Sequence, residues 1–167
     1  LASMLPLAES RGLCRTKTER IPAPYLPLPG SWEDLLQGKS KNFRKQFNNH
    51  WNRLHKQHRV EVLRAGTDLP IDEAFEVLLQ LNSRRWGPDQ QSFTTQKSRR
   101  FFHQLAHRFQ ELGWLCFLIL KIDGAFAGAR FDFIYDGKLW NFQGGWNPDL
   151  AALSPGGRTP RRAGTRP

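Results

Sequence analysis

Two short stretches near the C-terminal end of the chain contain small residues that could bring a ligand close to the backbone. Gly144 and Gly145 stand just before Trp146, and Ser154-Pro-Gly-Gly157 follows after a short loop. Glycine permits such an approach because it has no side chain beyond Cα. Both stretches also have simpler interpretations, since the glycine pair could end a strand and Ser-Pro-Gly-Gly could be an ordinary turn.

His103 and His107 are a second place where chemistry could occur, because their i, i+4 spacing puts both side chains on one face of a predicted helix. Such a pair could share a metal ion. No glutamate follows the first histidine as it does in zinc peptidases, and the sequence indicates no third ligand. We therefore interpret the pair as part of a polar helix face and expect no metal. His55 and His58 receive the same interpretation.

The third candidate is a basic helix over about residues 39–59. Residues 31–64 carry eight Lys or Arg against three Asp or Glu, in a chain whose net charge is +10. These charges could neutralise nucleic-acid phosphates, and Trp51 could stack on a base. However, Trp51 lies on an apolar stripe with Phe43 and Phe47. We therefore expect Trp51 in the core and a solvated basic face.

Three strand-like runs must position the glycine pair. They span residues 114–122, 126–135 and 139–143, and they are separated by Asp123-Gly124 and Asp136-Gly137. Asp-Gly between such runs is a strong hairpin signal, because both central positions of a type I′ turn need a positive φ. The pattern predicts an antiparallel meander.

Helices are predicted before and around this meander. Ser31 has the features of an N-cap of a short helix, and a longer helix is expected over about residues 40–58. A strand at 60–64 then precedes helices at 71–86 and 95–112. The order of elements predicts an α/β fold with a mainly antiparallel central sheet flanked by helices.

The composition limits the classes of protein to consider. A chain of 167 residues with 39% apolar content can form one domain with a core. The sequence contains no run approaching the roughly 18–20 apolar residues of a membrane span, and the first ten residues lack the features of a signal peptide. Cys14 and Cys116 are far apart, so we expect free thiols and a cytoplasmic location. Residues 158–167, with four arginines and two prolines, should be a disordered basic tail.

Two sets of residues resemble a known family. The first set comprises Pro24-Tyr-Leu-Pro-Leu-Pro29, Trp32 and Ser40-Lys-Asn-Phe-Arg44. The second comprises Leu81-Asn-Ser-Arg-Arg-Trp86, the predicted helix and strands after it, Gly144-Gly145-Trp146 and Leu153-Ser-Pro-Gly156. In this order and spacing, residues 22–157 resemble the CelD/BioF-like acetyltransferase domain family. That family belongs to the GNAT superfamily of N-acetyltransferases and is related to the Fem peptidyltransferases.

The resemblance implies a GNAT-like fold and an acyl-CoA cosubstrate, whose pyrophosphate lies on backbone N–H groups where a loop enters a helix. Such a loop needs a capping residue, small residues and the positive end of a helix dipole. The glycine pair would lie where a strand opens for the pantetheine arm. The residues expected to bind the cofactor are Gly144, Gly145, Ser154, Pro155, Gly156 and Gly157.

The reaction implied by the resemblance is direct attack of an amine on the thioester carbonyl, aided by oxyanion-type hydrogen bonds. The sequence does not identify a general base, and the nearest polar groups are Asp132, Tyr135 and Asp149. Asp132 could instead face solvent on its strand, and Asp149 could be a turn residue. Trp86 could line a substrate pocket or belong to the core.

We therefore expect an N-acyltransferase that moves an acyl group from acetyl-CoA or another acyl-CoA to an amine acceptor. Residues 1–30 would be a connector and residues 31–157 the catalytic domain. In the family, the Ser-Pro-Gly turn opens an amphipathic helix, whereas no helical pattern follows Gly157. The domain is thus expected to be truncated and impaired. The alternatives are a non-catalytic nucleic-acid or tRNA-binding module that uses residues 39–59, and an inactive remnant.

Overall fold

The computed structural model describes residues 24–86 and 95–153. The chain divides into two compact units, one up to Arg44 and the other from Lys45 onward. The domain start expected at residue 31 lies inside the first unit. The Ser-Pro-Gly-Gly stretch and the C-terminal residues 158–167 lie outside the described residues, as does Cys14.

The short helix α2 covers Trp32–Gln37 in the first unit. Its N-cap is Ser31, whose Oγ accepts a hydrogen bond of 3.0 Å from the backbone N–H of Asp34. Glu33 and Asp34 stand in the first turn, where acidic side chains interact favourably with the helix dipole. The predicted helix start is therefore confirmed.

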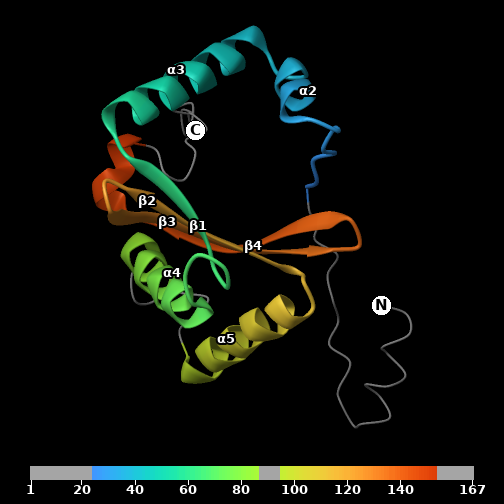
Figure 1. Cartoon of the computed structure of the whole chain (residues 1–167), viewed down its shortest axis with the longest axis vertical. Helices are drawn as coiled ribbons and strands as arrows, with labels where there is room; N and C mark the ends of the chain where they lie inside the picture. Colours follow the sequence, from blue (N-terminus) through green and yellow to red (C-terminus); the bar gives the residue numbers. More distant parts are fainter. Residues whose placement is uncertain (1–23, 87–94, 154–167) are drawn as a thin grey trace, which may run out of the picture. The chain divides into compact units, whose positions relative to one another are not determined.

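The second unit is built on one antiparallel sheet in the order β1-β2-β3-β4, labelled in Figure 1. The strands are β1 (Val60–Arg64), β2 (Leu115–Ile122), β3 (Ala125–Tyr135) and β4 (Lys138–Trp146). The predicted meander is confirmed. The predicted end of its last strand at residue 143 is wrong, because β4 continues through the glycine pair to Trp146.

The two Asp-Gly pairs form the turns of the meander. Asp123 and Gly124 have φ values of 51° and 80°, and Asp136 and Gly137 have values of 52° and 65°. These left-handed conformations suit a turn whose twist matches that of the flanking strands. Asp and Gly at these positions therefore fix where each hairpin folds.

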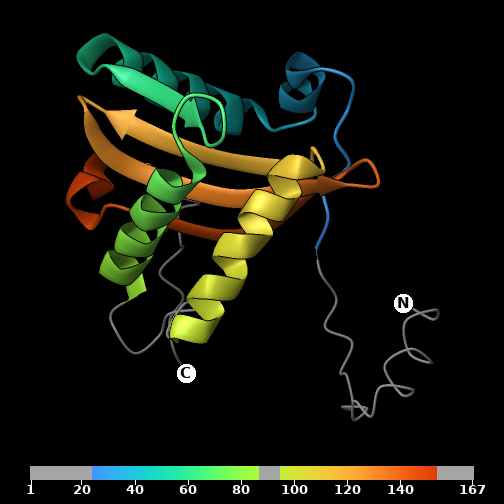
Figure 2. The ribbon, with the colours of Figure 1, turned by 60° about the horizontal axis from the view of Figure 1, so that its bottom comes forward.

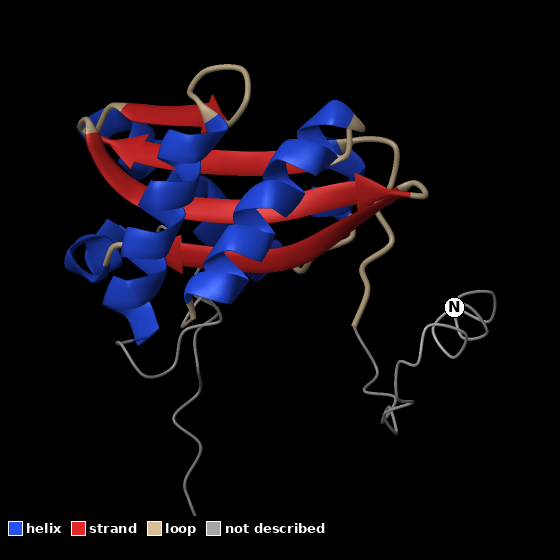
Figure 3. Ribbon diagram, turned by 90° about the horizontal axis from the view of Figure 1, so that it is seen from below, coloured by secondary structure: helices blue, strands red, loops and turns tan. Residues whose placement is uncertain are grey.

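Two helices, α4 (Ile71–Trp86) and α5 (Gln96–Glu111), cover one face of the sheet, as Figures 2 and 3 show. The side chains between them form the core. From α4, Phe75 and Leu78 are at most 2% exposed, and from the sheet Phe117, Ile119 and Phe131 are equally buried. This layer confirms the predicted fold class, an α/β fold with an antiparallel sheet flanked by helices.

The helix α3 covers Lys41–Gln57, close to its predicted bounds, but it does not contribute to the core. None of its residues is buried within the part of the chain that the structure describes. Trp51 is 52% exposed, so the prediction that it belongs to the core is wrong. An apolar stripe becomes core only where another element covers it. Here the Trp51 ring contacts its own helix, with His55 at 4.1 Å and Phe47 at 6.0 Å between ring centroids.

A short 3-10 helix, η1 (Pro148–Leu153), follows β4. The carbonyl oxygen of Leu153 lies 3.1 Å from Nε2 of His50, which connects η1 to α3. Among the described residues, no helix combines the length and the apolar character required to cross a membrane.

Candidate active site

The strands of the second unit and the end of α4 border an open hollow with a volume of about 600 Å³. Its apolar wall comes from β1 and β2, through Val62, Leu118 and Leu120. These β2 residues alternate with Phe117 and Ile119, which pack on the helices, so the main wall of the hollow belongs to the opposite face of the sheet. Its polar wall comes from β3, β4 and the end of α4, and the residues with polar side chains are Arg85, Arg130 and Asn141.

A buried carboxylate supports this polar wall. Asp132 is only 2% exposed, and its Oδ2 lies 2.7 Å from Nη2 of Arg130. Its Oδ1 accepts a hydrogen bond of 2.8 Å from Nδ2 of Asn141. A register shift between Phe131 and Asp132 sets Asp132 opposite Asn141 on β4. The alternative that Asp132 faces solvent is therefore wrong, because both of its oxygens are engaged inside the protein.

Cys116 lies across the β2–β3 ladder from Asp132. Burial raises the pKa of its thiol, and the nearby Asp132 carboxylate raises it further, against smaller opposing effects of Arg130 and Arg64. The thiol is therefore neutral near pH 7 and is a weak nucleophile. This agrees with a reaction that does not pass through a cysteine-bound intermediate.

The glycine pair lies in the wall of the hollow and has two different surroundings. The carbonyl oxygen of Gly144 accepts a hydrogen bond of 3.2 Å from Nδ2 of Asn82 on α4. Gly145 is buried against the same helix, and a Cβ atom there would lie 2.6 Å from the backbone nitrogen of Asn82 and 2.7 Å from the carbonyl carbon of Leu81. Glycine at position 145 therefore allows α4 to pack directly on β4.

Asn82 contacts the wall of the hollow through Gly144, and the sequence interpretation did not single it out. Its side chain is 2% exposed, and its Oδ1 has no hydrogen-bond partner among the described residues. A buried polar atom without a partner is costly, which makes Asn82 unusual for a core position. The only sequence signal was its place after Leu81 in the stretch that carries the family resemblance.

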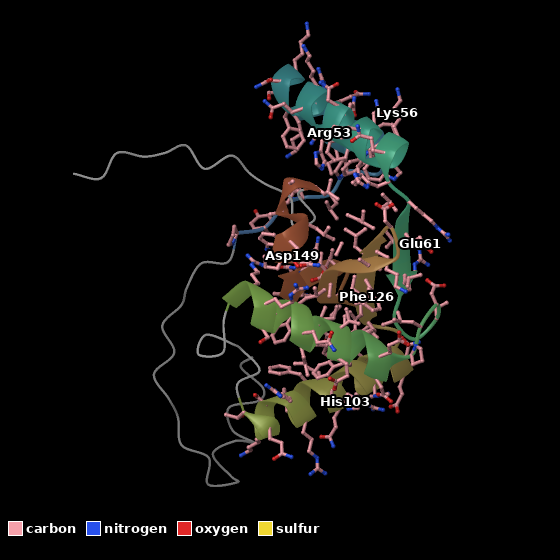
Figure 4. All side chains as sticks on the ribbon, turned by 90° about the vertical axis from the view of Figure 1, so that its left-hand side faces the viewer. Arg53, Lys56, Glu61, His103, Phe126 and Asp149 are labelled. Carbon is pink, nitrogen blue, oxygen red and sulfur yellow. The ribbon has the colours of Figure 1, made fainter. Side chains whose placement is uncertain are left out.

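Tyr135 and Asp149, two of the expected site residues, do not line the hollow. Tyr135 ends β3 and is 51% exposed, and its ring packs at 4.8 Å from that of Trp114. Tyr135 is five positions from Arg130 along β3, which corresponds to about 17 Å along a strand. Asp149 in η1 forms an exposed ion pair of 2.6 Å with Nη2 of Arg84; Figure 4 labels it. Trp86 is the last residue of α4, and its side chain lies outside the description.

The histidine pair lies on α5, away from the residues of the hollow. Nε2 of His103 and Nε2 of His107 each lie 2.7 Å from Oδ1 of Asp72, which stands in the first turn of α4. A carboxylate that the sequence did not indicate therefore stands beside both histidines. The contact between Asp72 and the histidines could not be predicted from sequence spacing, because Asp72 precedes His103 by 31 positions.

Comparison with known proteins gives one result. A family model described as an acetyltransferase (GNAT) domain matches residues 41–158, a segment that includes every described element from α3 to η1. Searches of curated proteins and of solved structures found no match. The match extends over most of the chain, and the four-stranded antiparallel sheet with its flanking helices agrees with it. The chain therefore belongs to the acetyltransferase (GNAT) domain family.

Proposed function

We propose that the protein transfers an acyl group from acetyl-CoA or another acyl-CoA to an amine acceptor in the hollow above β3 and β4. Membership of the family supports acyl transfer as the reaction class. The observation that supports this location is the position of Gly144 and Gly145 in the wall of the hollow, beside the polar residues Arg130 and Asn141.

The backbone of β4 offers the groups that such a reaction needs. Among the described residues β4 is the last strand of the sheet, so one row of its N–H and C=O groups faces away from β3. An N–H at the glycine pair can donate to the thioester oxygen as negative charge develops on it. Asn82 holds the Gly144 carbonyl and thereby fixes the orientation of that peptide.

The charged side chains of the hollow suit an anionic ligand. Arg85 and Arg130 both line it, and Asp132 with Asn141 fixes the position of the Arg130 guanidinium. Because both carboxylate oxygens of Asp132 are already engaged, we assign Asp132 a positioning role in place of the general base considered from the sequence. The anionic group would be a CoA phosphate or an acidic part of the acceptor.

The remaining parts of the proposal come from the sequence. Ser154, Pro155, Gly156 and Gly157 directly follow η1, and in our proposal they bind the CoA pyrophosphate as the family resemblance implies. Our proposal also places the protein in the cytoplasm, because acyl-CoA is present there and a free thiol such as that of Cys116 stays reduced in that compartment.

Thermal unfolding with acetyl-CoA tests the proposal, because a ligand that binds only the folded state raises Tm. We expect millimolar acetyl-CoA to stabilise the protein and Gly144→Val to remove most of that shift. Arg108→Gln, on α5 outside the residues of the hollow, should leave the shift unchanged. Release of free CoA in the presence of an amine then reports turnover. No stabilisation by acetyl-CoA at millimolar concentration would refute the proposal.

A second candidate function is favoured by the exposure of Trp51. The ring is accessible on α3, the same helix that carries Lys45, Arg53 and Lys56; Figure 4 labels the latter two. An exposed aromatic ring among cations can stack on an unpaired base while the cations contact phosphates. Binding to single-stranded RNA should then weaken at least threefold in Trp51→Ala and fall steeply with salt. Binding that is insensitive to both changes excludes this function.

A further inference from the structure

We propose that Asp72, His103 and His107 form a binding site for a divalent transition-metal ion that joins α4 to α5, with Zn²⁺ as the representative ion. No step of the argument depends on acyl transfer. It begins from the convergence of two helices, since the carboxylate comes from the first turn of α4 and both imidazoles come from α5. Figure 4 labels His103 on α5.

The geometry brings three ligand atoms to one point. The two histidines are one helical turn apart, and their Nε2 atoms each lie 2.7 Å from Oδ1 of Asp72. All three atoms lie within 4.8 Å of one another. Two separate helices thus bring two imidazole nitrogens and one carboxylate oxygen close enough together to be ligands of one metal ion.

The chemistry of the three groups selects the class of ion. Imidazole nitrogen and carboxylate oxygen together bind Zn²⁺ and its neighbours in the first transition series, whereas Mg²⁺ and Ca²⁺ prefer oxygen ligands alone. Three protein ligands leave at least one coordination position for water. The set therefore fits a borderline divalent ion.

The distances require a small adjustment. With bonds of about 2.0–2.1 Å, ligand atoms around a tetrahedral Zn²⁺ ion lie about 3.3 Å apart. Oδ1 of Asp72 would thus have to withdraw from the nitrogens by about 0.6 Å, and the two nitrogens, which lie within 4.8 Å of each other, would have to adopt the same spacing. The Asp72 side chain is 70% exposed and can make this movement without disturbing the core.

The surroundings hold the histidines in place and leave the site open to an ion from solution. The His103 ring meets the buried Phe75 ring edge-on at 5.4 Å, and the His107 ring lies 4.9 Å from that of His103. The side chains of His103 and His107 are 38% and 45% exposed. Packing thus orients the imidazoles, while their exposed parts give access.

A bound ion would affect the helix that supports the hollow. Asp72 begins α4, and the same helix carries Asn82 against Gly144 and Arg85 in the lining of the hollow. An ion that fixes the start of α4 against α5 would therefore restrain the helix whose far end positions β4. The proposed role is structural, because the ligands themselves lie outside the residues of the hollow.

Calorimetric titration of chelator-treated protein with Zn²⁺ tests the proposal directly. We expect one equivalent to bind and to raise Tm. The double substitution His103→Gln with His107→Gln should abolish this binding, and Asp72→Asn should weaken it at least tenfold, because a neutral amide is a poorer ligand than a carboxylate. His55→Gln is the matched control, since His55 is an exposed histidine on α3, and it should bind Zn²⁺ as the unmodified protein does.

Two results would overturn the proposal. One is the absence of Zn²⁺ binding, and the other is binding that the double substitution leaves unchanged, which would place the ion elsewhere, for example at His58 and Asp123. If the double variant does not fold, the paramagnetic resonance spectrum of Cu²⁺ bound to the unmodified protein decides. Coupling to two imidazole nitrogens supports the site, and coupling to one or none excludes it.

Discussion

The two faces of the sheet are made by the same strands but carry different kinds of side chain. On the face covered by α4 and α5, Phe117 and Phe131 are at most 2% exposed and belong to an apolar cluster. On the other face, Leu118 and Arg130 border a hollow and are only partly covered. The first face therefore supplies most of the folding free energy, and the second is available for a ligand.

Truncating one side chain on each face should give the largest contrast. Phe117→Ala removes a fully buried ring and should cost about 3–5 kcal/mol of unfolding free energy through lost burial and a cavity. Leu118→Ala changes the adjacent residue on the same strand, and it should cost about 1 kcal/mol because the side chain is only partly covered. Urea unfolding measures both. Equal losses would contradict the division of the sheet into a packed face and an open face.

The two partners of the ion pair between Arg130 and Asp132 on the open face should differ in how much stability is lost when each is replaced. Arg130→Met leaves the Asp132 carboxylate buried without its cation, whereas Asp132→Asn leaves a guanidinium that is 57% exposed and can be hydrated. We expect losses of about 2–3 kcal/mol for Arg130→Met and about 1 kcal/mol for Asp132→Asn. Urea unfolding at neutral pH compares them. A larger loss in Asp132→Asn would show that the buried carboxylate is not stabilised mainly by Arg130.

Gly145 and Gly144 differ in the same way as the two faces of the sheet, since Gly145 packs on α4 and Gly144 has more space around it. Gly145→Ala places Cβ at 2.6 Å from the backbone of α4 and should cost about 1–3 kcal/mol, because helix and strand must separate. In Gly144→Ala the nearest atom, the carbonyl oxygen of Ala129, lies at 3.1 Å and needs only a small shift. Gly144→Ala should therefore retain more stability while weakening acetyl-CoA binding. Thermal unfolding with and without acetyl-CoA separates the two effects, and equal destabilisation would contradict the packing role of Gly145.

The sequence predicted what depends on neighbours in the chain. Asp123-Gly124 and Asp136-Gly137 located both hairpins, because the requirement for positive φ is a property of the turn residues themselves. The helix bounds followed from capping and apolar spacing for the same reason. The position of Asp132 between Phe131 and Phe133 indicated that it leaves the core face, but the alternation did not show that Arg130 and Asn141 would enclose it.

The features that the sequence did not reveal depend on contacts between distant segments. The apolar stripe predicts Trp51 in the core, yet burial of its side chain depends on whether another element covers that stripe. Asp72 and His103 come together because α4 and α5 cross the same face of the sheet. Asn82 reaches Gly144 over 62 positions of sequence. Neither of these two contacts leaves a repeating pattern in the sequence from which it could be predicted.

The smallest change in unfolding free energy is expected for a substitution at Asp123, in the turn between β2 and β3, which belongs to neither face of the sheet. Hydrogen bonds from His58 and from the Arg59 N–H hold the pKa of Asp123 below its ordinary value. A lowered pKa in the folded state means that the contribution is present above the pKa of the unfolded chain and is lost as pH falls through the folded value. Asp123→Asn keeps an acceptor for the Arg59 N–H and tolerates the positive φ, so it removes mainly the charge.

The difference between the unfolding free energies of the unmodified protein and of Asp123→Asn should therefore be present near pH 6. It should disappear as pH falls below about 4, the ordinary pKa of an aspartate, and through the lower pKa that Asp123 has in the folded state. Urea unfolding across this range gives the difference at each pH. The part of the difference in unfolding free energy that depends on pH should be small, because the Asp123 carboxylate is 56% exposed and water screens its charge. A difference that stays constant down to pH 2 would mean that the turn geometry, and not the charge of Asp123, is what the substitution disturbs.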